Sequence, residues 1–379
     1  MNDALPSYAQ SAIKRELLAA GVSGTIYALV MPESEAALAQ VVDGCDRSLL
    51  LHDPAALDAA RRACWFDRYR EPWTQKQDAL HEGYFDRWLA WAAPVVDVEG
   101  AAFPYRYPSA GASEGIYKLI AEHGARIRDA GGNPGIHVFD GEYEGFAAFA
   151  AALSLPLVRH RRDDWRSVPG DVPAGAQFWL SQPSAIDGRV WPHFEAFVAQ
   201  MAIDAPQAAV IPDLTYVGSV ATPYRIALDS PNIPAFVISH SKPFGGYYHR
   251  VGGVFARTES ASLFGNRWFK NLQSLAWGVE MMTRHDVFAL PRRYAPVQAA
   301  ACAQAGTRLG ISGLRPADVI LLATAPPPPR PSPLIASVLR GEGSDRVVRL
   351  CLTPAMTVLI DPTMAPMMAA TLGSTGQAA

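Results

Sequence analysis

Through the middle of the chain, between residues 113 and 257, short apolar runs alternate with longer amphipathic stretches. The apolar runs have the length of β-strands and occupy residues 135–140, 156–160, 177–182, 208–214, 235–241 and 251–257. Helix candidates lie at residues 113–129, 145–153 and 191–202. Continuous apolar strands that alternate with helices are typical of a mostly parallel sheet with helices on both faces. Such α/β sheets bind ligands at the carboxyl ends of their strands, so we expect the chemistry of this chain there.

The pattern changes near residue 286. An alanine-rich helical stretch at residues 296–309 leads to two apolar runs with a short helix at 333–340 between them. We predict a large domain at residues 46–285 and a smaller α+β domain at 286–379, with residues 1–45 packed against the small domain. The proline-rich residues 324–333 indicate a rigid connection within the small domain, and an SH3-type docking motif is the alternative.

Composition excludes several classes of protein. Hydrophobic residues make up 49% of the chain, enough for a large core, and the net charge of −3 provides no basic field for nucleic acid. The sequence has no apolar run of eighteen residues and no signal-peptide pattern at its start, so we expect a cytoplasmic protein without a membrane segment. Its four scattered cysteines lack zinc spacing, which predicts free thiols and no metal site.

The segment VISHSKPFGGYYHRVGG at residues 237–253 carries the strongest chemical signal. Lys242 directly follows a predicted strand end that holds Ser239 and Ser241, and a glycine-rich turn leads to Arg250. Burial in a cleft lowers the pKa of a lysine and suits it to form a Schiff base. An arginine can hold a phosphate through paired hydrogen bonds, to which serine hydroxyls add. The alternative is a surface lysine and arginine beside a flexible loop.

This segment resembles the lysine motif of the class I/II aminotransferases, which are pyridoxal-phosphate enzymes of fold type I. The motif S-x-S-K is followed by seven residues and then by Arg-Val-Gly. His240 between the serines, and the bulky Tyr247, Tyr248 and His249, depart from the motif. Because neighbouring strand residues point to opposite faces, His240 points away from the serines, and we expect it to have a structural role.

Further motifs of this family follow in the family's order. AVIPDLTYVG contains Asp213 and Tyr216, which the resemblance implies pair with the pyridine nitrogen and bond the 3-oxygen of the cofactor. YPSAGASEGIYKLI resembles the phosphate loop, with Ala112 and Ser113 at a helix N-terminus that favours an anion. Ser113 could equally be a plain N-cap. FDGEYEGF places Tyr143 where the family stacks an aromatic ring on the cofactor, and a core position is the alternative.

Two further segments concern the substrate and a departure from the family. RVVRLCLTP resembles the strand whose arginine binds the substrate α-carboxylate; Arg349 is the better match and Arg346 the alternative. The family's N-P-x-N-P-T-G is replaced by QPSAIDG, so Ala185 stands where an asparagine usually binds the 3-oxygen. The replacement predicts altered electron flow and a specialised substrate.

The resemblance implies a fold type I transferase that is a homodimer with its active sites at the interface. It implies that Lys242 holds pyridoxal 5'-phosphate and that an amino acid reacts through a Schiff base and a Cα carbanion. Amino-group transfer, in specialised biosynthesis, is the predicted activity. The alternative is β- or γ-elimination, replacement or cyclisation, for example on S-adenosylmethionine or a modified amino acid. A non-catalytic ligand-binding relative is more remote, as is a nicotinamide enzyme, because no G-x-G-x-x-G follows a strand.

Overall fold

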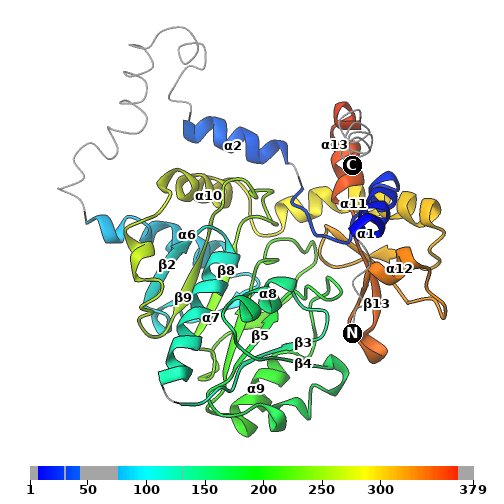
Figure 1. The fold of residues 1–379 in the computed structure, drawn as a ribbon. Coiled ribbons are helices and arrows are strands. Elements are labelled where there is room, and N and C mark those ends of the chain that lie inside the picture. The colour runs from blue at the N-terminus through cyan, green and yellow to red at the C-terminus, as the bar shows by residue number, and fades with distance from the viewer. Residues whose placement is uncertain (1–6, 30, 43–75, 130, 366–379) are drawn as a thin grey trace.

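The computed structural model describes residues 7–29, 31–42, 76–129 and 131–365. A seven-stranded sheet forms the centre of its larger part (Figure 1). In order across the sheet, the strands are β2 (Tyr105–Ser109), β9 (Gly252–Ala256), β8 (Ala235–Ser239), β6 (Ala209–Asp213), β5 (Gln177–Ser181), β3 (Ile136–Phe139) and β4 (Leu157–His160). Neighbouring strands from β8 to β4 are parallel, and β9 is antiparallel to both of its neighbours. The prediction of a mostly parallel sheet is therefore confirmed.

Helices cover both faces of this sheet. They include α6 (Glu82–Ala92), α7 (Ala112–Asp129), α8 (Glu144–Ala152), α9 (Phe194–Asp204) and α10 (Leu272–Arg284). Successive strand residues point to opposite faces, so Phe236 of β8 packs against Trp88 of α6, with ring centroids 5.9 Å apart. Its neighbour Val237 belongs to a second buried cluster that contains Ile116 of α7. Burial on both faces explains why these strands are continuously apolar in sequence.

A four-stranded antiparallel sheet lies at the centre of the smaller part. Its strand order is β10 (Arg315–Pro316), β11 (Leu322–Ala325), β13 (Val347–Cys351) and β12 (Leu339–Arg340). The helices of this part are α11 (Ala289–Leu309), α12 (Pro333–Ser337) and α13 (Thr353–Ile360). The proline-rich segment connects β11 to α12.

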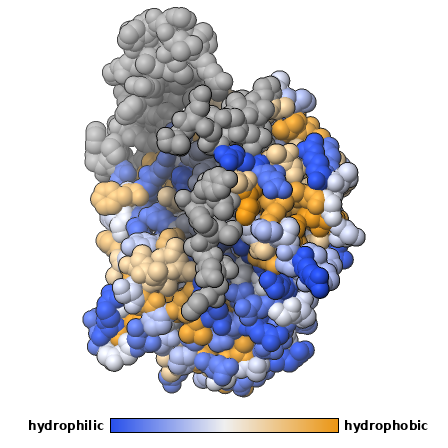
Figure 2. Space-filling view, turned by 45° about the vertical axis from the view of Figure 1, so that its right-hand side comes forward, coloured by the Kyte–Doolittle hydropathy of each residue, from blue (hydrophilic) through white to orange (hydrophobic). Residues whose placement is uncertain are grey.

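The N-terminal residues contact both parts of the molecule. Helix α1 (Ser7–Ala19) packs against α12, whereas α2 (Pro32–Val42) packs against α10 (Figure 1). A short parallel pair, β1 (Val96–Asp97) with β7 (Ile226–Ala227), lies outside the two larger sheets. On the face shown in Figure 2, hydrophobic and hydrophilic residues are interspersed. Within the described ranges, no helix has the length and apolar character needed to cross a membrane.

Helix α7 approaches the sheet unusually closely at Gly115. A Cβ atom at this position would lie 2.6 Å from Cγ2 of Val254 on β9 and 3.6 Å from Val237 on β8. The absence of a side chain therefore lets the N-terminal turn of α7 lie directly over these two strands.

We predict that Gly115→Ala lowers the free energy of unfolding. Overpacking costs about 1–3 kcal/mol, which exceeds the gain of about 1 kcal/mol in helix propensity. Gly83→Ala in α6 is the matched control, because no atom lies within 4 Å of a Cβ atom there. Urea unfolding followed by circular dichroism would measure both variants. Equal midpoints for the two variants would show that the close approach at Gly115 does not constrain α7.

Candidate active site at the carboxyl edge of the large sheet

The strand register brings the predicted site residues to one edge of the large sheet. The strands β5, β6 and β8 end at this edge, and the antiparallel β9 begins there beside the end of β2. The pairs that define the edge are Ser181 with Asp213, Asp213 with Val237, Ser239 with Gly252, and Ser109 with Gly252. Residues that are far apart in sequence therefore meet within one short stretch of the sheet edge.

Asp213 is a buried carboxylate at the end of β6, with only 5% of its surface exposed. Its Oδ1 accepts hydrogen bonds from the amide and hydroxyl of Thr215 at 3.0 and 2.5 Å. Burial raises the pKa of Asp213 to about 6, although the Thr215 bonds act in the opposite direction. The chain then turns, with the amide of Val217 bonded to the carbonyl of Leu214, and places Tyr216 nearby. Burial raises the pKa of this tyrosine above its usual range.

Lys242 follows the end of β8, and its Nζ donates to the carbonyl of Ile26 at 2.5 Å. Burial is the largest cause of a fall in its pKa to about 8, and the positive charges of Arg250 and Arg349 add to that fall. Two buried serines, Ser239 and Ser241, precede this lysine at the end of β8. The hydroxyl of Ser239 accepts a hydrogen bond from the amide of Ser241 at 3.2 Å. The arrangement provides a lysine whose unprotonated fraction near neutral pH is far larger than that of an ordinary lysine.

Arg250 lies against the loop that precedes α7. Its Nη2 donates to the carbonyl of Ala110 at 2.7 Å, and its backbone has the left-handed φ of 49°. A Cβ atom at Gly111 would lie 2.9 Å from the same Nη2, so only glycine lets the loop and the guanidinium approach this closely. Helix α7 begins at Ala112, and Ser113 is its second residue rather than its N-cap. The arginine thus lies beside the N-terminus of α7, where an anion is favoured.

Tyr143 contacts the first turn of α7. The residue lies at the N-cap of α8, and its hydroxyl forms a hydrogen bond of 3.0 Å with the hydroxyl of Ser113.

The residue before Tyr143 is Glu142, a buried carboxylate that the sequence analysis missed. Glu142 accepts from the amides of Ser181 and Tyr143 at 3.0 and 3.3 Å, and burial raises its pKa to about 7. An acidic residue three positions after the end of the buried strand β3 was the signal that could have revealed it.

Arg349 reaches the site from β13 of the small sheet. It is buried, and its Nη1 and Nη2 donate to the carbonyls of Ala185 and Gly24. Arg346, the alternative from sequence, is exposed at the end of a short 3₁₀ helix (Gly343–Asp345). The structure therefore brings Arg349, and not Arg346, into contact with the larger part of the molecule, at Ala185.

His240 lies away from these groups. Its side chain is fully buried among the rings of Tyr84, Trp91 and Phe244, at centroid distances of 4.9–6.0 Å. Within the part of the chain that the structure describes, neither ring nitrogen has a hydrogen-bond partner, and burial lowers the pKa of this histidine to about 3. The side chain is therefore a neutral core group behind the lysine.

Three charged groups of the site lack an opposite charge within ion-pair distance among the described residues: Asp213, Lys242 and Arg250. Asp213 is buried, whereas Lys242 and Arg250 are partly exposed. A buried charge is normally paired, so a site with an unpaired buried acid beside unpaired bases is complementary to a ligand that carries both signs. No cluster of histidine, cysteine and acidic residues suited to a metal ion occurs in the described ranges.

Comparison with known proteins places this arrangement in context. No protein-family model matches the chain, and no curated protein matches it by sequence. Solved structures share its fold. A probable N-succinyldiaminopimelate aminotransferase from Thermus thermophilus has 17% identity and a TM-score of 0.56, over 91% of this chain and 95% of the other.

Two further solved structures represent different activities. A methionine aminotransferase from Escherichia coli has 16% identity and a TM-score of 0.55, over 74% of this chain and 82% of its own. A C–S lyase from Staphylococcus hominis, bound to pyridoxal phosphate, has 13% identity and a TM-score of 0.57, over 76% and 81%. The chain therefore has the fold of the fold type I pyridoxal-phosphate-dependent aminotransferases.

Proposed function

We propose that this chain is a pyridoxal-phosphate-dependent aminotransferase that acts on an amino acid. One observation carries the proposal: a lysine of lowered pKa and a buried, unpaired aspartate lie at one sheet edge, beside an arginine and a helix N-terminus. Each of these groups is complementary to a different part of the same cofactor, and the fold is that of enzymes that use it.

The charges and donors of the site fit pyridoxal phosphate. The carboxylate of Asp213 suits a protonated ring nitrogen, because a buried anion without a cation is costly. Arg250 and the first amides of α7, at Ala112 and Ser113, suit the phosphate. We assign the ring of Tyr143, whose hydroxyl bonds to Ser113, to the face of the cofactor ring. The buried hydroxyl of Tyr216 suits the 3-oxygen.

Each residue has a distinct task in the proposed reaction. When bound, the cofactor supplies an electron sink for the electron pair left at Cα of the amino acid. The amine of Lys242, once released from the cofactor, is the base that takes the Cα proton and returns it. Arg349 binds the α-carboxylate and so fixes which bond at Cα faces the ring. Asp213 keeps the ring nitrogen charged.

Elimination or replacement at Cβ or Cγ is the second candidate function. It is favoured by Ala185, whose methyl group cannot donate a hydrogen bond to the 3-oxygen, and by the C–S lyase among the structures of similar fold. The two functions share every residue named above and differ in the fate of the electrons. Keto-acid production from a panel of amino acids would indicate transfer, and release of a side-chain fragment would indicate elimination.

We also propose a homodimer in a reducing, cytoplasmic compartment. Large aromatic side chains are exposed close to Arg250: Tyr248 is 91% and Phe269 86% accessible. A cavity of about 90 Å³ lined by Arg250, Phe269 and Lys270 lies beside them. Exposed apolar residues around a cavity favour a protein interface, and a second copy of the chain would cover the outer side of the phosphate loop.

The attachment point of the cofactor is directly testable. Borohydride treatment of the protein loaded with pyridoxal phosphate should fix one cofactor on Lys242, as peptide mass spectrometry would show. Lys242→Ala should abolish the label and the yellow colour. Lys270→Ala is the matched control, because Lys270 also has a pKa lowered by burial and donates to main-chain carbonyls. A label on Lys270 or elsewhere, with Lys242 unmodified, would refute the assignment.

The lowered pKa of Lys242 predicts how attachment depends on pH. The neutral amine is the nucleophile, so the rate of attachment should fall about tenfold per unit below pH 8 and level off above it. Arg349→Gln removes a nearby positive charge and should move the midpoint to higher pH. Stopped-flow absorbance on cofactor-free protein would measure both. A midpoint near the ordinary lysine value of about 10.5 would contradict the buried environment.

A further inference from the structure

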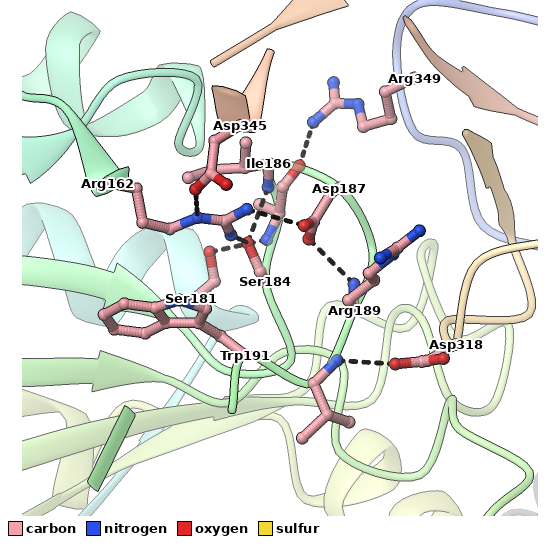
Figure 3. A network of polar contacts seen from close by, with 12 residues as sticks. Arg162, Ser181, Ser184, Ile186, Asp187, Arg189, Trp191, Asp318, Asp345 and Arg349 are labelled. Atoms are coloured by element: carbon pink, nitrogen blue, oxygen red, sulfur yellow. Dashed lines mark hydrogen bonds and ion pairs between the residues drawn. The ribbon is translucent and has the colours of Figure 1, made fainter. Parts of the chain in front are cut away.

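Arg162 is a buried arginine that the proposed reaction does not use. It stands at the start of a 3₁₀ helix (Arg162–Asp164), far from the lysine in sequence, and is only 6% exposed. Figure 3 shows its guanidinium at the centre of a polar network. Its Nη1 donates to Oγ of Ser184 at 3.0 Å, its Nη2 to Oδ2 of Asp187 at 2.7 Å, and its Nε to a carboxylate oxygen of Asp345.

Two of these partners flank Ala185, the residue that replaces the expected asparagine. The amide of Ala185 donates to Oγ of Ser181 at 3.1 Å, and its carbonyl accepts from Nη1 of Arg349. The loop turns tightly at this point, because the amide of Gly188 donates to the carbonyl of Ser184 at 2.9 Å. Arg162 thus holds the loop on both sides of the carbonyl that Arg349 contacts (Figure 3).

The third partner lies on the other side of the same contact. Asp345 belongs to the small domain and precedes β13, the strand that carries Arg349. A second link lies beside it, where the amide of Ser344 donates to Oδ2 of Asp163 at 2.7 Å. One guanidinium therefore ties the Ala185 loop of the large domain to the turn that leads into the strand of Arg349.

Hydrogen bonds orient the guanidinium of Arg349, but little negative charge lies close enough to neutralise it. Both of its terminal nitrogens donate to main-chain carbonyls, whereas its buried Nε has no hydrogen-bond partner in the described structure. The carboxylate within ion-pair distance is that of Glu144, at 3.9 Å, whose side chain is 67% exposed and also pairs with Arg340 at 2.6 Å. An almost fully buried cation held in this way is suited to an anionic ligand.

We propose that Arg162 is a positioning residue for recognition of the substrate α-carboxylate: it fixes the Ala185 carbonyl and the β13 turn against each other, and thereby aims Arg349. This inference rests on the proposed function. Ala185 has no polar side chain, so its main-chain carbonyl is the group that orients Arg349. The position of this carbonyl depends on how firmly the loop that carries it is held. The polar network around Arg162 fixes that loop.

A purely structural role for Arg162 makes a different prediction. A buried ion pair that only joins the two domains would, when broken, lower stability and weaken every ligand alike. A positioning role weakens only ligands that carry a carboxylate. The test therefore needs two probes that differ in this group alone and whose use does not depend on knowing the natural amino acid.

Aminooxyacetate and O-ethylhydroxylamine are such a pair. Both carry an aminooxy nitrogen that displaces the lysine nitrogen from the cofactor's aldehyde carbon and releases the amine of Lys242. They differ by a carboxylate in place of a methyl group. The ratio of their second-order rate constants with the loaded protein, followed by loss of the yellow colour, measures recognition of the carboxylate and does not require turnover.

We expect wild type to prefer aminooxyacetate and Arg349→Gln to lose this preference. Arg162→Gln should reduce the preference about ten- to a hundredfold, because small misplacements of a binding group have effects of this size. The rate with O-ethylhydroxylamine and the affinity for pyridoxal phosphate should stay within about twofold. The double variant should match Arg349→Gln, because Arg162 acts through Arg349. Arg159→Gln, an exposed arginine on β4 outside this network, should behave like wild type.

The outcomes separate the two proposals. If Arg162→Gln keeps the preference, or weakens both probes equally, the positioning role is wrong while the proposed function stands. If wild type shows no preference, the assignment of Arg349 fails and the inference fails with it. If the protein binds no pyridoxal phosphate, the proposed function itself fails. Should Arg162→Gln not fold, Asp345→Ala removes one of the three bonds and should reduce the preference in the same direction, with an unchanged melting temperature of the unloaded protein.

Discussion

Buried charge without an internal partner is the constraint on which this site depends. Among the residues that the structure describes, the carboxylate of Asp213 accepts hydrogen bonds from Thr215 alone, and Lys242 and Arg349 donate to main-chain carbonyls rather than to carboxylates. A protein interior tolerates such groups poorly, and burial shifts the pKa of Asp213 up and that of Lys242 down. These shifts lessen when a ligand of complementary charge is bound. The free-energy cost of leaving these charges unpaired therefore favours binding of a charged cofactor and a charged substrate.

The sheet is what makes this concentration of charge possible. Parallel strands end at a common edge, and the antiparallel β9 begins there, so Asp213, Ser239 and Gly252 arrive together from separate parts of the chain. The strands beneath are buried on both faces and anchor these ends in a rigid core. Helix α7 adds its N-terminus because Gly115 lets it lie close to β8 and β9. Rigid placement of this kind lets a few side chains act without reorganising.

The sequence predicted those strands and functional motifs that have a local pattern of residues. The apolar runs predicted six of the seven strands of the large sheet to within one or two residues, because burial on both faces leaves a continuous apolar signature, and only β2 at the sheet edge was missed. The motifs around Lys242, Asp213 and Ala112 follow strand ends or open a helix, and the structure gathers them at one edge. Their catalytic and binding roles stay predictions. The choice between Arg349 and Arg346 needed the structure, which buries the first and exposes the second.

Other parts of the site had no local pattern to reveal them. The carbonyls of Gly24 and Ile26 contact Arg349 and Lys242 from more than 200 residues away in sequence, and a main-chain carbonyl carries no sequence signature. In the sequence, Arg162 is one of several arginines in a charged stretch, and only the fold shows that it is buried. Such long-range polar contacts depend on how the larger and smaller parts of the molecule pack against each other, and no sequence motif encodes that packing.

The central claim is that the sheet edge binds a cofactor that carries an aldehyde, a protonated ring nitrogen and a phosphate. Titration of the cofactor-free protein with pyridoxal phosphate, and separately with pyridoxal, would test it most directly by absorbance and calorimetry. The account predicts one pyridoxal phosphate per chain, bound at least about a hundredfold more tightly than pyridoxal, because Arg250 and the start of α7 hold the phosphate. Equal affinity for both compounds, or no saturable binding of either, would contradict it.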